Sequence, residues 1–151
     1  MDIRDQRGFS LVEIIISVLL MSVVLGLSVP SYRNYTLKTE RTDASNALLQ
    51  LTVAQERYYL THGTYADNNR LQQATPDGLG FSDGLSSQGY YDLSIEPHTE
   101  GLTVGYIATA TVNTENRQRD DIECLSLSTD QDGRRSANGD YNNAVVMHCW
   151  Q

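Results

Sequence analysis

The stretch RGFSLVEIIISVLLMSVVLGLSVP, residues 7–30, decides how this chain is organised. Between residues 9 and 29 the only charged side chain is one carboxylate, Glu13. As an α-helix this segment would be about 31 Å long, close to the thickness of the hydrocarbon core of a bilayer. A carboxylate inside that layer costs on the order of a few kcal/mol, so the position of Glu13 needs an explanation.

Two common kinds of apolar segment do not account for residues 9–30. A secretory signal peptide has a shorter apolar run, and a small-residue cleavage site follows that run. Here the apolar run ends at Pro30, and Ser31-Tyr32-Arg33 follows. An ordinary transmembrane anchor fits the length and tolerates Pro30 near its end, but it leaves Glu13 unexplained.

The residues in front of the apolar run suggest a third interpretation. A short polar leader, MDIRDQRG, ends in Arg7-Gly8, and Phe9 then opens the apolar run. Together with Glu13 and Pro30, this pattern resembles the N-terminus of type IV pilins. Residues 55–65 also resemble the corresponding part of minor pilins of the PilE type.

The resemblance implies three domains and a maturation step. A prepilin peptidase that is also an N-methyltransferase would cut between Gly8 and Phe9 and methylate the new amino group of Phe9. Residues 1–8 would then be the cleaved leader, and residues 9–30 a transmembrane or filament-core helix. Residues 31–151 would form the globular pilin head.

The resemblance also assigns a role to Glu13. In a pilus the N-terminal helices pack together, and Glu13 of one subunit would face the Phe9 amine of a neighbour. A paired charge is far less costly in an apolar medium than an isolated one, and the pairing sets the register of the subunits. The alternative is that Glu13 lies at the headgroup interface without a role. Major pilins usually have a glycine where this chain has Ser22, so where the helix melts in a filament stays open.

Downstream of Pro30 the pattern predicts a helix followed by a sheet. Apolar residues at spacings of three and four between Ala44 and Tyr58 predict an amphipathic helix that ends near Gly63. Five glycines and many polar residues predict a long loop over 63–89. Alternating apolar and polar residues predict four strands, over 91–95, 102–112, 124–128 and 144–147. A polar stretch predicts a turn or loop over 130–143. The predicted fold class is α+β: a long N-terminal helix packed on a four-stranded antiparallel sheet, which is the pilin fold.

The two cysteines, Cys124 and Cys149, predict one disulfide formed outside the cytoplasm. The alternative is two buried free thiols. In type IV pilins a disulfide at this place bounds a surface loop, here residues 124–149, that contacts partners. The chain has no Cys-x-x-Cys motif, no phosphate loop and no Ser/His/Asp arrangement, so we expect a structural protein and not an enzyme.

The distribution of charged residues indicates which ligands the chain is expected to bind. The net charge of −8 gives no general attraction to nucleic acid. Arg134-Arg135 is the one basic doublet beyond the helix, and with Tyr141 nearby it is a candidate DNA contact, although a solvated loop is the favoured interpretation. The sequence 130–133, with Asp140, is a weak match to a calcium loop, and a plain turn is favoured there. We expect no metal and no cofactor.

These observations predict a structural subunit, a minor pilin, of a type IV pilus that serves motility, adhesion or DNA uptake. The expected partners are other pilin subunits, the prepilin peptidase and an inner-membrane assembly platform; nucleic acid is not favoured. The expected location is the inner membrane before assembly and then the extracellular pilus of a bacterium. The alternatives are a DNA-receptor minor pilin and a type II secretion pseudopilin. The cysteine pair argues against the pseudopilin, because the major member of that family typically uses calcium in place of a disulfide.

Overall fold

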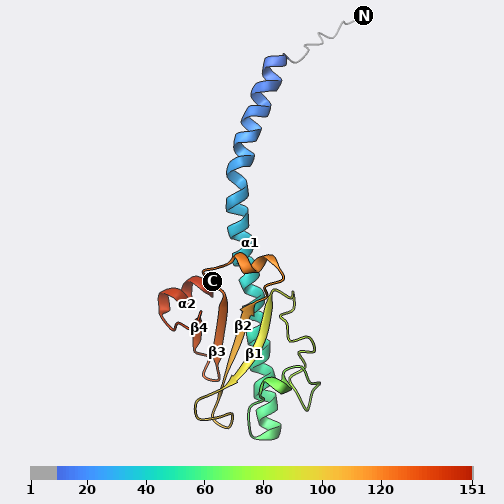
Figure 1. Ribbon diagram of the computed structural model, residues 1–151, viewed down its shortest axis with the longest axis vertical. Helices are drawn as coiled ribbons and strands as arrows, with labels where there is room; N and C mark the ends of the chain where they lie inside the picture. The colour runs from blue at the N-terminus through green and yellow to red at the C-terminus, as the bar shows by residue number, and fades with distance from the viewer. Residues whose placement is uncertain (1–9, 151) are drawn as a thin grey trace, which may run out of the picture. The chain divides into compact units, whose positions relative to one another are not determined.

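The computed structural model describes residues 10–150, without the side chains of residues 26–31. The chain divides into two compact units, Met1–Thr36 and Leu37–Gln151. One helix, α1 (Leu11–His62), contributes to both units (Figure 1). The predicted processing residues Gly8 and Phe9 lie outside the described residues.

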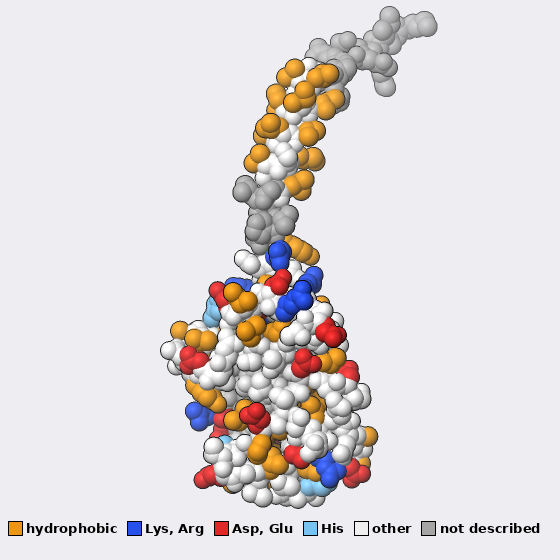
Figure 2. Space-filling model, viewed as in Figure 1, with side chains coloured by type: hydrophobic (Ala, Val, Ile, Leu, Met, Phe, Trp, Pro, Cys, Tyr) orange, Lys and Arg blue, Asp and Glu red, His pale blue; other side chains and the backbone are white. Residues whose placement is uncertain are grey.

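In the first unit, α1 exposes apolar side chains on all sides. The large apolar residues from Leu11 to Leu25 are each between 53% and 72% exposed (Figure 2). The backbone stays helical through Ser22, whose hydroxyl donates to the Leu19 carbonyl at 2.8 Å, and through Pro30. Within residues 10–150, no helix combines the length and the apolar character needed to cross a membrane.

The second unit packs α1 against one antiparallel sheet. The strands follow one another in space as they do in the sequence, in the order β1-β2-β3-β4. Their bounds are β1 Tyr91–Pro97, β2 Tyr106–Val112, β3 Ser126–Asp130 and β4 Arg135–Ala137. Alternate side chains of β1 and β2 are buried against apolar α1 residues such as Leu48 and Leu51, with α1 behind the sheet in Figure 1. The predicted fold class is therefore confirmed.

The helix ends where the sequence predicts. The last residue of α1 is His62, and Gly63 adopts the left-handed conformation with φ of 69°. The following loop has one short 3₁₀ turn, η1 (Asn68–Arg70), and it buries Leu71 and Leu79. At Gly78 a Cβ atom would lie 2.4 Å from Cβ of Gln73, so this close approach requires glycine.

Two predicted strands are shorter than expected or displaced. The strand predicted over 102–112 begins only at Tyr106, because a turn occupies the residues before it, with Val104 N–H donating to the Gly101 carbonyl at 3.1 Å. The strand predicted over 124–128 is β3 and covers Ser126–Asp130.

The prediction for the C-terminal strand is wrong. Residues 144–147 belong to a helix, α2 (Asn143–Cys149). The Asn142 side chain caps this helix by accepting a hydrogen bond from Ala144 N–H at 2.9 Å, and such a cap favours a helix over a strand. The fourth strand is β4, which lies inside the stretch 130–143 for which the sequence predicts a turn.

A buried ion pair joins α1 to the connection between β2 and β3. The Arg41 guanidinium donates two hydrogen bonds to the Asp121 carboxylate, each 2.7 Å long, and a third to the His148 carbonyl at 3.0 Å. The Gln118 amide donates to Asp121 at 3.0 Å and to the Tyr91 hydroxyl at 2.9 Å. The hydrogen bonds to Asp121 raise the pKa of Arg41 above its ordinary value. The pair therefore connects the helix, the sheet and the C-terminal segment.

Two further α1 carboxylates hold neighbouring connections. Glu40 accepts hydrogen bonds from Arg117, which begins the 3₁₀ helix η2 (Arg117–Asp120). Asp43 accepts from the Ser86 hydroxyl at 2.5 Å and from Gln88 N–H at 3.2 Å. These contacts hold the β2–β3 connection and the last part of the loop between α1 and β1 against the helix.

We predict that Asp121→Ala lowers the free energy of unfolding by about 3–5 kcal/mol, because it leaves the Arg41 charge buried without its partner. Denaturant unfolding of the full chain in detergent, followed by circular dichroism, measures this loss. The control Glu123→Gln removes an exposed carboxylate beside the same connection, and we expect it to leave the unfolding midpoint almost unchanged. Equal losses in the two variants would contradict a special role for the buried pair.

We also predict that the protein loses stability in alkali through the buried Tyr91 and Tyr106 and the partly buried Tyr65. Burial raises the pKa of Tyr65 to about 12, and it raises the pKa values of Tyr91 and Tyr106 above the ordinary value. Above about pH 10 these tyrosines lose protons in the unfolded chain but keep them in the folded chain, so the stability present at lower pH is lost as the pH rises. Unfolding at pH 8 and pH 11 measures the loss, and Tyr91→Phe should make it smaller. A loss unchanged in Tyr91→Phe would contradict the assignment to this tyrosine.

Candidate functional site

The first candidate site is the predicted assembly motif at the N-terminus. Glu13 lies in the first turn of α1, exposed and surrounded by exposed apolar side chains. Its backbone carbonyl accepts a hydrogen bond from the Ser17 hydroxyl at 2.8 Å. Gly8 and Phe9 are outside the described residues, and the side chain of Pro30 is not described. A role for Glu13 in pairing between subunits therefore stays a prediction.

The second candidate site is the C-terminal region that carries Arg134 and Arg135. A tight turn joins β3 to β4, and the Asp130 carboxylate accepts hydrogen bonds from Asp132 N–H at 3.0 Å and Arg134 N–H at 2.8 Å. Gly133 completes the turn with φ of 74°. This carboxylate thus acts as a cap for the turn, which is the interpretation favoured over a calcium loop. Across residues 10–150, no group of three or more His, Cys, Asp or Glu side chains is placed to hold a metal.

The two arginines each cover an aromatic ring. The Arg134 guanidinium carbon lies 5.2 Å from the centroid of the Tyr141 ring, and that of Arg135 lies 4.6 Å from the Trp150 ring. The Trp150 ring is held in place because its indole N–H donates to the Ser136 carbonyl at 3.0 Å. No carboxylate of the described residues pairs with either guanidinium. Their N–H groups are therefore available to an anionic ligand.

The predicted disulfide is confirmed and fixes this region. Cys124 and Cys149 are fully buried and bonded to one another, with Cα atoms 5.6 Å apart. Beside them, the Glu123 carboxylate and the His148 ring nitrogen Nε2 lie 2.9 Å apart, and this contact lowers the pKa of Glu123. The disulfide therefore holds α2 against the segment that precedes β3, and it sets the position of Trp150.

A groove of about 310 Å³ lies between α1 and this C-terminal region. Polar and apolar α1 side chains form one wall, including Asn46, Leu49 and Thr52. Arg135 and Trp150 form part of the other wall. A groove with a guanidinium stacked on a partly exposed indole can take a planar or anionic group.

Sequence reasoning identified the arginine doublet and Tyr141 but missed Trp150. Trp150 is the only tryptophan of the chain and directly follows Cys149. Its position next to a cysteine that was predicted to form a disulfide was the signal in the sequence. What the sequence did not contain is the pairing of Arg135 with Trp150, because it depends on how β4 and α2 pack.

Comparison with known proteins identifies the family. Residues 30–128 match the family described as type IV minor pilin ComP, DNA uptake sequence receptor. The chain belongs to this family. Residues 3–29 of the pilin match the prokaryotic N-terminal methylation motif. The resemblance to type IV pilins noted from the N-terminus is thus confirmed.

Individual relatives of the chain include fimbrial proteins. The pilin is 26% identical over 110 residues to a fimbrial protein of Neisseria meningitidis, a match that covers 73% of the pilin and 60% of the relative. It is 27% identical over 108 residues to a fimbrial protein of Pseudomonas aeruginosa, covering 70% and 69%. A solved type IV pilin from Shewanella oneidensis is 21% identical, with a TM-score of 0.44, over 71% of this chain and 98% of that one. The pilin therefore spans about 60% of the length of the first of these relatives.

Proposed function

We propose that this chain is a structural subunit, a minor pilin, of a type IV pilus and that its N-terminal helix packs inside the filament. The observation that carries the proposal is the exposure of every large apolar side chain of α1 from Leu11 to Leu25. A helix that is apolar all round is stable only when other apolar groups surround it. The helices of neighbouring subunits supply such surroundings in a filament, and a bilayer supplies them before assembly.

The methylation motif supports a matching maturation. A prepilin peptidase cleaves between Gly8 and Phe9 on the cytoplasmic side and methylates the Phe9 amine. The precursor is held in the inner membrane by residues 9–30 until an assembly platform transfers it to the extracellular pilus. The Phe9 ammonium then provides the partner that the Glu13 carboxylate needs in an apolar environment.

The proposal is tested by shearing pili from cells and asking whether they contain the chain. Labelling with antibody shows whether the subunit is rare, as expected of a minor pilin, or abundant along the shaft. Intact mass spectrometry of the sheared subunit should show cleavage after Gly8 and one added methyl group. Absence of the chain from sheared pili of a piliated strain would overturn the proposal.

We predict that Glu13→Leu sharply reduces the amount of the chain in sheared pili, although it makes the segment more apolar and so favours membrane insertion. The reason is that the Phe9 amine of a neighbouring subunit then has no carboxylate to pair with. Quantitative immunoblots of sheared pili and of membranes measure the two pools. Glu13→Asp is the matched control, and we expect it to restore part of the assembly because it keeps the charge. Normal assembly of Glu13→Leu would contradict the pairing.

A second candidate function is that of a DNA receptor during DNA uptake. The description of the family supports it, and so does the pair of arginines stacked on Tyr141 and Trp150. Arginines without a carboxylate partner bind phosphates, while aromatic rings beside them stack on bases. The net charge of −8 means that any such binding depends on this local surface.

We predict that Arg134→Ala/Arg135→Ala weakens DNA binding of the full chain in detergent at low salt by about tenfold. We expect the slope of log K against log salt concentration to become shallower by the amount that about two phosphate contacts contribute, since two guanidinium groups are removed. Mobility shift assays over a salt series measure both quantities. Arg70→Ala/Arg119→Ala removes the same charge from other loops and should have a much smaller effect. Equal weakening of DNA binding by the two double variants would indicate that only the net charge matters and would exclude a specific site at Arg134 and Arg135.

A further inference from the structure

One wall of the groove between α1 and the C-terminal region is a guanidinium backed by an aromatic ring. Arg135 is exposed, and its guanidinium carbon lies over the Trp150 ring, 4.6 Å from the ring centroid. The ring is fixed in turn, because its N–H donates to the Ser136 carbonyl and the preceding residue is in the disulfide. The side of the guanidinium that faces away from the ring is therefore a fixed surface on which a second planar group can stack.

The opposite wall of the groove offers hydrogen-bond acceptors from α1. Ser45 and Thr52 line the groove, and their spacing of seven residues places them on one face of the helix. The Ser45 hydroxyl donates to the Arg41 carbonyl at 3.3 Å, and the Thr52 hydroxyl donates to the Leu48 carbonyl at 2.9 Å. Because each hydroxyl hydrogen is already used, both oxygens accept hydrogen bonds from a ligand.

An unused amide lies on the same wall. Asn46 lines the groove and is exposed. Among the residues that the structure describes, none hydrogen-bonds to the side-chain amide of Asn46. An amide both donates and accepts, and asparagine makes paired hydrogen bonds with the edge of a nucleobase in this way. The two walls together provide a surface for the face of a planar heterocycle and polar groups for its edge.

The size of the groove suits a single base. A cavity of about 150 Å³ is enough to hold benzene, and this groove has a volume of about 310 Å³. A base inside a regular duplex has both faces covered by its neighbours, and only its edges are reached from outside. A base that is out of the stack presents its face as well. The geometry therefore suits an unpaired base and not a stacked one.

The charges around the groove suit the backbone that carries such a base. Arg134 precedes Arg135 on the same turn, and no carboxylate of the described residues pairs with it, so it is available to a neighbouring phosphate. The match to the minor-pilin family ends at residue 128. Arg135 and Trp150 lie beyond this point, so the family match does not assign this wall of the groove.

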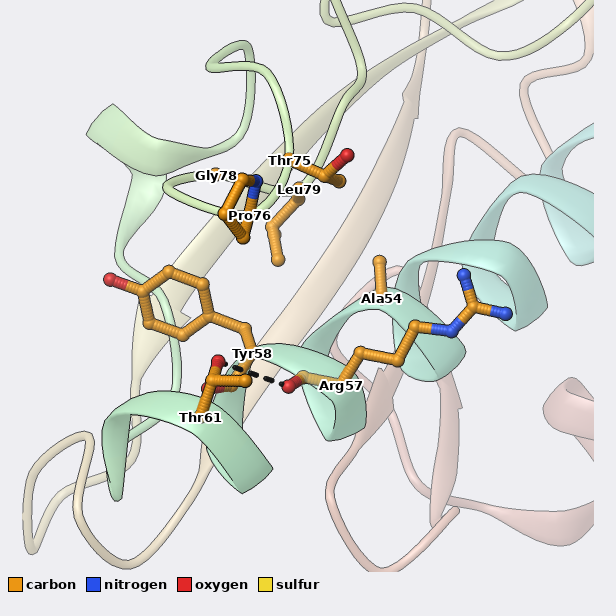
Figure 3. A pocket seen from close by; sticks show the side chains of 8 residues that line it. All are labelled: Ala54, Arg57, Tyr58, Thr61, Thr75, Pro76, Gly78 and Leu79. Atoms are coloured by element: carbon orange, nitrogen blue, oxygen red, sulfur yellow. Dashed lines mark hydrogen bonds between the residues drawn. The ribbon is translucent and has the colours of Figure 1, made fainter.

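Another hollow of the second unit lacks this arrangement. It has a volume of about 230 Å³ and lies between the end of α1 and residues 75–79 (Figure 3). Arg57 lines it, but Figure 3 shows the Arg57 side chain extending away from the Tyr58 ring. Arg57 therefore provides charge without a stacking surface, and it serves as a comparison for Arg135.

We propose that the groove between α1 and the β3–β4 turn binds one unpaired base of a DNA strand. The base stacks on the Arg135 guanidinium, which Trp150 supports, and its edge forms hydrogen bonds with Asn46. This inference rests on the proposed role as a DNA receptor and deepens it, because it names the form of DNA that the site prefers.

The experiment compares two DNA molecules that differ by one unpaired base. One is a short mixed-sequence duplex, and the other is the same duplex with a single bulged adenine. Mobility shifts with the full chain in detergent at low salt should show that the bulged duplex binds about tenfold more tightly, since stacking of one base is gained. Trp150 is the only tryptophan of the chain, so its fluorescence reports on the groove. We expect the bulged duplex to quench this fluorescence more than the regular one at equal occupancy.

Two variants test whether the groove holds the base. Arg135→Lys keeps the charge but removes the planar group, and Asn46→Ala removes the amide. Each should bring the ratio of the two affinities close to one. Arg57→Lys is the control for the first variant. Gln50→Ala is the control for the second, because it removes an exposed α1 amide that does not line the groove. Both controls should keep the tenfold preference.

The outcomes separate this inference from the proposed function. Equal binding of the bulged and the regular duplex overturns the inference and leaves the role as a DNA receptor intact. A preference that survives Arg135→Lys and Asn46→Ala also overturns it, because the unpaired base is then bound elsewhere. If neither duplex binds, the role as a DNA receptor fails together with the inference, whereas the role as a pilus subunit is unaffected.

Discussion

The buried pair of Arg41 and Asp121 is the contact on which the rest of the second unit depends. The residues are far apart in the sequence, and their two 2.7 Å hydrogen bonds join α1 to the connection that leads into β3. The third hydrogen bond, to the His148 carbonyl, extends the link to α2. A single guanidinium therefore holds the helix, the sheet connection and the C-terminal segment. A buried charge is tolerated in this place because a carboxylate and a carbonyl accept its hydrogen bonds.

The disulfide connects the region of this buried pair to the surface of the second unit. Cys124 lies three residues after Asp121, and its bond to Cys149 brings α2 and Trp150 beside β4. Arg135 then lies over the Trp150 ring, and the turn capped by Asp130 presents Arg134 to Tyr141. The basic surface of this acidic protein is thus a product of the buried pair and the disulfide together. On the other side of Cys124, the same constraints leave Ile122 exposed on a fixed base.

The N-terminal half of α1 follows a different constraint. Its large apolar side chains from Leu11 to Leu25 are exposed in the single chain. Burial of such a surface requires other molecules, whether lipids or the helices of neighbouring subunits. The one carboxylate of this segment, Glu13, restricts which surroundings are favourable, because a carboxylate is stable in an apolar medium only opposite a positive charge.

Local patterns in the sequence determined the parts of the structure that depend on near neighbours. The period of the apolar residues from Ala44 to Tyr58 predicted the amphipathic half of α1, and Gly63 predicted its end. Alternation predicted β1 and most of β2, because side chains of a strand point to opposite faces in turn. The N-terminal motif, which is read from contiguous residues, was enough to indicate the family.

The tertiary structure decided everything that depends on distant partners. The strand β4 has three residues, too few to show alternation, and it exists because β3 pairs with it. The Val145-Val146 pair suggested a strand, but the Asn142 cap and the bond at Cys149 make this segment the helix α2. No local pattern could pair Arg41 with Asp121 or place Arg135 on Trp150, because these contacts form only when the helix and the sheet pack. The sequence by itself therefore determined the helix, the family and most of the sheet, whereas packing decided which charges are buried and which remain available to a partner.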